Sequence, residues 1–198
     1  MTQPLHITDV GPRDGLQNLA VPVPLDVKIK LVRGLADAGV KEIEVGSFVN
    51  PKLVPQMADT AELFREVADL KDRGVVLSAL VPNERGLDAA LEAGASKIAV
   101  FASVTETFSQ RNTGGSCAEV HERLVPVVYR AKEAGLPVRG YLSCVFGDPF
   151  EPANLTHLAW DARQRMHDLA VNELDLGDTF GTADPASVEA VIKTYETH

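Results

Sequence analysis

The sequence predicts an α/β protein of the (β/α)8 TIM-barrel class, with about six of the eight βα units present in the chain. Apolar, strand-like runs alternate with segments of helical periodicity along the 198 residues. Three similar junctions, Ala38-Gly39-Val40, Ala93-Gly94-Ala95 and Ala134-Gly135-Leu136, each end a predicted helix at a glycine and lead into a strand. Six units of about 33 residues each suit a barrel that needs about 250 residues for all eight.

The elements are expected in strict βα order. Short apolar and β-branched runs predict strands at residues 5–10, 42–45, 75–81, 97–101, 138–144 and 173–176. Helical spacing predicts helices at residues 26–38, 58–70, 84–92, 117–134, 152–169 and 185–195. Pro152 stands near the start of one helix, where its missing N–H does no harm. Asp184 is the expected N-cap of the last helix.

A doubly wound sheet is the alternative architecture, since it can also use six strands. That fold usually carries a glycine-rich phosphate loop after its first strand. Here the first strand is followed by Gly11-Pro12-Arg13-Asp14-Gly15, which does not match G-x-G-x-x-G. No linker or low-complexity stretch interrupts the chain. We therefore expect residues 1–198 to form a single, incomplete barrel domain that lacks its last two units.

Composition excludes several classes of function. Nineteen Lys and Arg residues stand against 28 Asp and Glu residues, so the formal net charge is −9. An acidic surface repels phosphate backbones, which argues against nucleic-acid binding. No apolar run approaches the roughly 20 residues of a membrane helix, and the first five residues do not resemble a signal peptide. Two cysteines are too few for a disulfide framework or a zinc site. We expect a cytoplasmic protein with neither a nucleic-acid nor a membrane partner.

Polar residues gather behind the predicted strands. Barrel enzymes place their chemistry at the carboxyl ends of the strands, so we expect these residues to converge on one mouth. They are Arg13, Asp14 and Gln17; Glu44 and Ser47; Ser103, Thr105, Glu106, Arg111 and Asn112; Arg139, Tyr141 and Ser143; and Asp175, Asp178 and Thr179.

Adjacent Arg13 and Asp14 have two interpretations. A carboxylate beside a guanidinium is held in its charged form, and a charged carboxylate is a hard oxygen ligand for Mg²⁺ or Mn²⁺. The guanidinium can in turn stabilise a developing oxyanion. An ion pair that only supports a turn explains the same two residues, and their spacing does not decide between the two.

Glu44, Asp178 and the two cysteines also have alternative interpretations. Glu44 lies in a strand that is covered on both sides, so its charge needs a partner, for which Arg13 is the obvious candidate. Asp178 is either a site residue or a cap in a turn. Cys117 begins a helix, where a lowered thiol pKa is conceivable, although both Cys117 and Cys144 are more typical of structural thiols. The five histidines are scattered, without an H-x-H or H-E-x-x-H motif.

Five ordered blocks resemble the hydroxymethylglutaryl-CoA lyases, within a superfamily of metal-dependent lyases and synthases that are TIM barrels. The resemblance covers nearly the whole chain, and the block R-D-G-L-Q is more typical of the lyases than of the synthases, which more often have R-D-G-E-Q. The blocks are residues 10–18 (VGPRDGLQN), 43–57 (IEVGSFVNPK through VPQM), 108–112 (FSQRN), 138–144 (VRGYLSC) and 176–181 (LGDTFG).

The resemblance implies roles for individual residues. Asp14 would bind a divalent metal ion, Mg²⁺ or Mn²⁺, and Arg13 would contact the substrate carbonyl and stabilise the enolate of acetyl-CoA. Glu44 and Asp178 would support the metal and the acid–base chemistry. The pocket would be lined by Gln17, Ser47, Asn112 and Tyr141. The implied reaction cleaves 3-hydroxy-3-methylglutaryl-CoA to acetyl-CoA and acetoacetate, a step of leucine degradation, and a homodimer is possible.

The chain also departs from the family pattern. The family's H-x-H metal ligands, the catalytic cysteine of its glycine-rich loop and a later asparagine ligand have no match among these residues. Neither Cys117 nor Cys144 fits the catalytic-cysteine motif. The resemblance therefore implies a pyruvate carboxyltransferase-like barrel that looks truncated after its sixth unit, and that by itself would lack lyase activity. A non-catalytic barrel fragment and a related lyase or synthase for another acyl-CoA remain alternatives.

Overall fold

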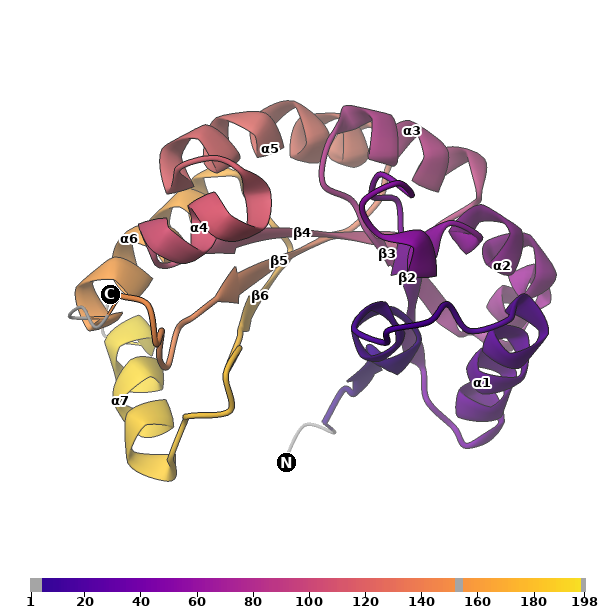
Figure 1. Ribbon diagram of the computed structural model, residues 1–198, viewed down its shortest axis with the longest axis horizontal. Coiled ribbons are helices and arrows are strands. Elements are labelled where there is room, and N and C mark those ends of the chain that lie inside the picture. The colour runs from indigo at the N-terminus through magenta and orange to yellow at the C-terminus, as the bar shows by residue number, and fades with distance from the viewer. Residues whose placement is uncertain (1–4, 152–154, 197–198) are drawn as a thin grey trace. The chain divides into compact units, whose positions relative to one another are not determined.

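The structure, a computed structural model, describes residues 5–151 and 155–196 (Figure 1). The expected helix start at Pro152 and the residue His198 lie outside the described residues. The chain divides into two compact units, Met1–Ala99 and Val100–His198. Each unit is built from strands followed by helices, so the α/β class and the βα order are confirmed.

Strands follow one another in chain order. The first unit holds β1 (Thr8–Asp9), β2 (Glu42–Ser47), β3 (Val76–Leu80) and the start of β4 (Lys97–Ser103), paired in parallel. The second unit continues from the end of β4 to β5 (Val138–Ser143) and β6 (Glu173–Leu176), and β5 and β6 are again parallel. Parallel order with a crossover between neighbouring strands is the arrangement of βα repeats.

The first strand is shorter than residues 5–10. Only Thr8 and Asp9 pair with β2. The preceding Leu5 and Ile7 are 93% and 67% exposed, so this apolar run is not packed as a core strand. By contrast, every residue of β2 is buried, as expected for a parallel strand covered on both faces.

Helices of the first unit are α1 (Leu25–Asp37), α2 (Thr60–Glu66) and α3 (Glu84–Glu92). In Figure 1, α1 and α2 run beside each other, and both contact β2. The single helix expected over residues 58–70 is wrong, because α2 ends at Glu66 and a 3₁₀ helix, η3 (Ala68–Arg73), follows. Arg33 of α1 explains the break: its Nη2 donates to the Glu66 carbonyl at 2.7 Å, and its guanidinium also holds Asp69.

Helices of the second unit are α4 (Glu106–Thr113), α5 (Cys117–Glu133), α6 (Leu155–Asp168) and α7 (Pro185–Glu196). The predictions omitted α4, whose polar sequence gives little helical periodicity. A residue far along the chain stabilises its first turn, because Glu151 accepts a hydrogen bond from the Thr107 N–H at 2.9 Å. Asp184 caps α7 as predicted, accepting from the Ser187 N–H at 2.7 Å.

The three predicted glycine junctions are confirmed. Gly39, Gly94 and Gly135 have φ values of 97°, 77° and 76°, the left-handed conformation that ends a helix at low cost only for glycine. Each glycine therefore turns the chain from an outer helix toward the next strand.

Candidate active site

Directly after β1 the chain makes a π-helical turn, η1 (Gly11–Gly15), which contains Arg13 and Asp14. Pro12 stands at its first position, where no N–H is needed. The Val10 carbonyl oxygen accepts hydrogen bonds from the N–H groups of Arg13 at 3.1 Å and Asp14 at 2.7 Å. The turn contacts β2, and it buries Arg13 while leaving Asp14 exposed.

The Arg13 guanidinium joins two carboxylates. Its Nε donates to Oε1 of Glu44, and its Nη1 donates to Oδ1 of Asp14 at 2.7 Å. The Glu44 side chain is fully buried, the Arg13 side chain is 10% exposed and the Asp14 side chain is 55% exposed. The predicted partnership of Glu44 with Arg13 is confirmed. The pair fixes one guanidinium between a buried carboxylate and an exposed one.

Two buried polar atoms lie in the same unit. The Oε1 atom of Gln17 and the Oγ atom of Ser47 are shielded from solvent and have no hydrogen-bond partner among the described residues. Ser47 ends β2, after a register shift against β3 between Glu44 and Gly46. A buried polar atom without a partner is costly, so both positions suit contact with a ligand.

The second unit holds the other predicted residues. Both carboxylate oxygens of Asp178 accept backbone N–H groups, from Thr182 at 2.9 Å and from Ala183 at 3.1 Å. Asp178 therefore supports the turn after β6, which is the alternative that the sequence left open. Asn112 is exposed on α4, and Tyr141 is half-buried on β5. That these residues share one mouth with Arg13 stays a prediction.

Sequence reasoning missed Asp148, which is 7% exposed. Thr105, one of the predicted polar residues after β4, donates through Oγ1 to Asp148 Oδ2 at 2.6 Å, and the Phe150 N–H donates to Oδ1 at 2.8 Å. An aspartate before Pro149 reads as a turn residue, so nothing local indicated a buried carboxylate.

Cys117 has the properties of a structural thiol, which is the more typical of the two alternatives that the sequence left open. Burial, and to a smaller extent the nearby Glu106 carboxylate, raise the pKa of this thiol to about 11. Its Sγ lies 3.3 Å from the Ser103 carbonyl oxygen and donates to it. Burial also raises the pKa of Cys144, whose φ of 66° is unusual for a residue other than glycine. Both thiols therefore stay protonated at neutral pH.

The metal ion implied by the resemblance finds only part of a site. Within residues 5–151 and 155–196, no three His, Cys, Asp or Glu side chains group closely enough to hold a metal ion. Glu44 is sequestered by Arg13, and Asp178 by its turn. Of the three carboxylates of the predicted site, Asp14 has one oxygen that accepts from Arg13 and an exposed side chain, with the donor chemistry that Mg²⁺ or Mn²⁺ prefers. The described residues do not complete a metal centre.

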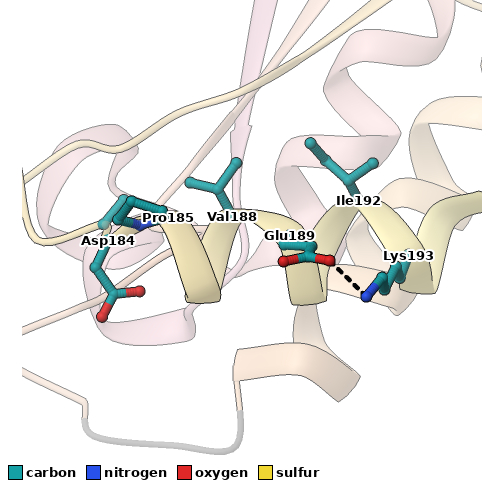
Figure 2. Close-up of a pocket in the computed structure, with 7 residues that line it drawn as sticks. Asp184, Pro185, Val188, Glu189, Ile192 and Lys193 are labelled. Atoms are coloured by element: carbon teal, nitrogen blue, oxygen red, sulfur yellow. Dashed lines mark ion pairs between the residues drawn. The ribbon is translucent and has the colours of Figure 1, made fainter.

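A shallow surface hollow of about 620 Å³ lies along α7. Figure 2 shows Val188 and Ile192 on one side of this helix, and the ion pair between Lys193 Nζ and Glu189 Oε1, 2.6 Å apart, on another. An i,i+4 ion pair is ordinary for a helix surface, so this hollow holds none of the chemistry of the predicted site. In the described part of the chain, no helix has the length and apolar character to cross a membrane.

Comparison with known proteins gives one consistent result. The 3-hydroxy-3-isohexenylglutaryl-CoA/hydroxymethylglutaryl-CoA lyase of Pseudomonas aeruginosa is 44% identical over 96% of this chain and 62% of its own length. The crystal structure of hydroxymethylglutaryl-CoA lyase from Pseudomonas aeruginosa has a TM-score of 0.91 at 42% identity, with 96% of this chain and 63% of that chain covered. An HMG-CoA lyase from Acinetobacter baumannii, solved with coenzyme A and 3-methylmalate, has a TM-score of 0.89 at 29% identity, covering 96% and 61%.

The chain thus spans about 60% of the length of the relatives that it matches. The HMGL-like family model matches residues 4–198. This match agrees with the sequence blocks that resemble the lyases and with the βα order of the fold. The chain belongs to the HMGL-like family.

Proposed function

We propose that this chain carries the enolate-stabilising half of a hydroxymethylglutaryl-CoA lyase, a carbon–carbon lyase. The substrate would be 3-hydroxy-3-methylglutaryl-CoA, and the products acetyl-CoA and acetoacetate, as in leucine degradation. Relatives that carry this activity in their names match 96% of the chain. Some relatives are named cytoplasmic and others mitochondrial, and the location proposed here is the cytoplasm.

The observation that supports the proposal most is that Arg13 donates to two carboxylates, Glu44 and Asp14. An arginine held by carboxylates on two sides cannot swing freely, so its positive charge is aimed before the substrate arrives. Preorganised charge of this kind stabilises an oxyanion without the cost of reorienting during the reaction. Glu44 acts here as an orienting group, because its buried carboxylate already accepts from Arg13.

The chemistry requires this charge at one moment. A base takes the proton of the tertiary hydroxyl, the hydroxyl oxygen becomes the ketone of acetoacetate, and the electron pair of the broken C–C bond moves into the thioester. The resulting enolate of acetyl-CoA bears negative charge on its oxygen, opposite Arg13. Protonation at carbon then gives acetyl-CoA. The guanidinium lowers the barrier by stabilising the enolate more than the neutral thioester.

Other predicted residues have supporting roles in the proposal. Gln17 and Ser47 would contact the substrate through their buried, unpaired oxygens. Asn112 and Tyr141 would line the pocket, and Asp178 would shape its rim. Asp14 would supply one oxygen to Mg²⁺ or Mn²⁺, which would bind substrate oxygens. The relative solved with coenzyme A supports an acyl-CoA partner, and a homodimer is the proposed assembly.

A related substrate is the second candidate. The Pseudomonas aeruginosa relative is named for a longer substrate, 3-hydroxy-3-isohexenylglutaryl-CoA, as well as for hydroxymethylglutaryl-CoA. Rates with both thioesters, measured side by side, separate the two activities. A preference for the longer acyl chain would mean that 3-hydroxy-3-isohexenylglutaryl-CoA is the substrate, and the proposed role of Arg13 would stay the same.

The test uses the native protein, with its intact mass measured first. Cleavage of hydroxymethylglutaryl-CoA is followed by acetoacetate release with Mg²⁺ or Mn²⁺. In a native protein as long as the relatives, we expect turnover, its loss in Asp14→Ala together with weaker metal binding, and normal metal binding in Arg13→Met; residues 1–198 alone should give no turnover. Absence of turnover with either thioester would favour the non-catalytic alternative. Equal loss of metal affinity in both variants would show that the Arg13–Asp14 pair is structural.

A further inference from the structure

A buried lysine in α1 lies behind the loop that carries Asp14. Lys28 is 3% exposed, and lysines are rarely buried unless they are paired. Its Nζ donates to the Gln56 carbonyl oxygen at 2.5 Å and to Asp59 Oδ1 at 2.5 Å. Gln56 belongs to the 3₁₀ helix η2 (Pro55–Met57) in the loop after β2. Lys28 thus anchors that loop to α1.

Gln56 also binds a second loop, the one that follows η1. Its side-chain Nε2 donates to the Leu19 carbonyl oxygen at 2.6 Å. Leu19 follows η1, in a stretch whose side chains are largely exposed. One residue earlier, Asn18 donates through Nδ2 to the Asp14 carbonyl oxygen at 2.8 Å. Three hydrogen bonds, joined through Gln56 and through the backbone of Leu19 and Asn18, therefore connect Lys28 to Asp14.

The two ends of residues 13–19 are held in different ways. At the inner end, Arg13 is fixed by buried Glu44. At the outer end, the Leu19 carbonyl is fixed by Gln56. Asp14 and Gln17 lie between these two anchors. A loop side chain is placed accurately only when the loop is tied on both sides, so the outer tie matters for both residues.

We propose that Gln56 and Lys28 are positioning residues, which hold residues 14–19 so that Asp14 and Gln17 face the reacting groups correctly. Lys28 is too buried to touch a substrate, and it acts through Gln56. The catalytic part of this inference rests on the proposed lyase function, whereas the structural part does not. Small misplacement of a reacting group costs rate more than binding, so kcat is expected to fall while KM stays nearly constant.

The test compares Gln56→Met, which keeps the length of the side chain but removes the donor, with Arg33→Gln. Arg33 is a matched control on the same helix, because it ties α1 to Asp69 and the Glu66 carbonyl, both outside residues 14–19. Amide hydrogen exchange is measured in the native protein. Gln56→Met should raise exchange about tenfold over residues 14–20, and Arg33→Gln should raise it only near residues 66–70.

Kinetics of the same variants complete the test. We expect kcat to fall about tenfold in Gln56→Met with KM within about twofold, and to be unchanged in Arg33→Gln. Lys28→Met should reproduce both effects of Gln56→Met, and Lys28→Arg should restore part of the loss. Unchanged exchange over residues 14–20 would overturn the proposal, as would raised exchange with normal kcat. If the wild-type protein has no lyase activity, the proposed function fails and the exchange pattern alone decides whether the tie exists.

Discussion

Glu42 and Glu44 stand two residues apart on β2 and therefore on the same face of the strand. Both are buried, with 2% and 0% of the residue exposed. Each is paired with a cation from a distant part of the first unit. Lys97 Nζ lies 3.0 Å from Glu42 Oε1, and Arg13 Nε donates to Glu44. By residue type and burial the two carboxylates are nearly identical, and each is paired with a buried cation.

They differ in what lies beyond the cation. Lys97 is itself buried, and its side chain is only 5% exposed. Arg13 continues to Asp14, whose side chain is 55% exposed. The Glu44 pair therefore ends in a carboxylate that an ion or substrate can reach, whereas the exposed group beside Glu42 is an imidazole: His6 Nε2 lies 2.9 Å from Glu42 Oε2, and the His6 side chain is 55% exposed. Burial and an ion pair do not by themselves mark a site, and the distinction is that the Glu44 pair is linked to an accessible carboxylate, which can bind a metal ion.

The largest expected effect concerns stability, at the Glu42 end. Lys97→Met removes the buried cation beside the Glu42 carboxylate, which keeps its contact with His6, and should lower the free energy of unfolding by up to about 3–5 kcal/mol. The double variant Glu42→Leu/Lys97→Met removes both charges and should recover most of that loss. Urea unfolding of the single and double variants measures this. A double variant as unstable as Lys97→Met would mean that the pair contributes more than charge compensation.

The next effect concerns activity, at the Glu44 end. Arg13→Met should lower kcat by about 10²–10³, the range for losing one oxyanion donor. The double variant Arg13→Met/Glu44→Leu should regain stability but not turnover, because the lost charge acted on the enolate. Recovery of kcat in this double variant would make the two glutamate pairs equivalent and would remove Arg13 from the mechanism. The Glu42→Leu/Lys97→Met variant is the matched control, with kcat expected near wild type.

This contrast also shows what the sequence could reveal. A charged side chain inside a covered strand needs a partner, and Arg13 could be named for Glu44 because both belong to the polar residues predicted at the carboxyl ends of the first two strands. Lys97 could not be named for Glu42 in the same way, because 55 residues separate them and no local pattern joins them. The βα order was predictable because glycine ends a helix through its own backbone conformation. The break after Glu66 and the short polar helix α4 were not, since both depend on side chains from elsewhere, Arg33 and Glu151.

The smallest expected effect extends the comparison to a buried acidic group that stays neutral. Cys117 is 3% exposed, its Sγ donates to backbone carbonyls, and its backbone N–H donates to Glu106. Burial raises its pKa from 9.0 to about 11. Below pH 9 the thiol is protonated in both the folded and the unfolded chain, so its contribution to stability is fully present. Between pH 9 and about 11 only the unfolded chain loses the proton, so this contribution declines by up to about 1.4 kcal/mol per pH unit.

Cys117→Ser keeps a donor for the Ser103 carbonyl but does not titrate in this range. The difference in unfolding free energy between wild type and Cys117→Ser, measured from pH 8 to 11, should therefore be flat at first and then fall. A difference that stays constant over the whole range would show that this thiol ionises as easily in the folded protein as in the unfolded chain.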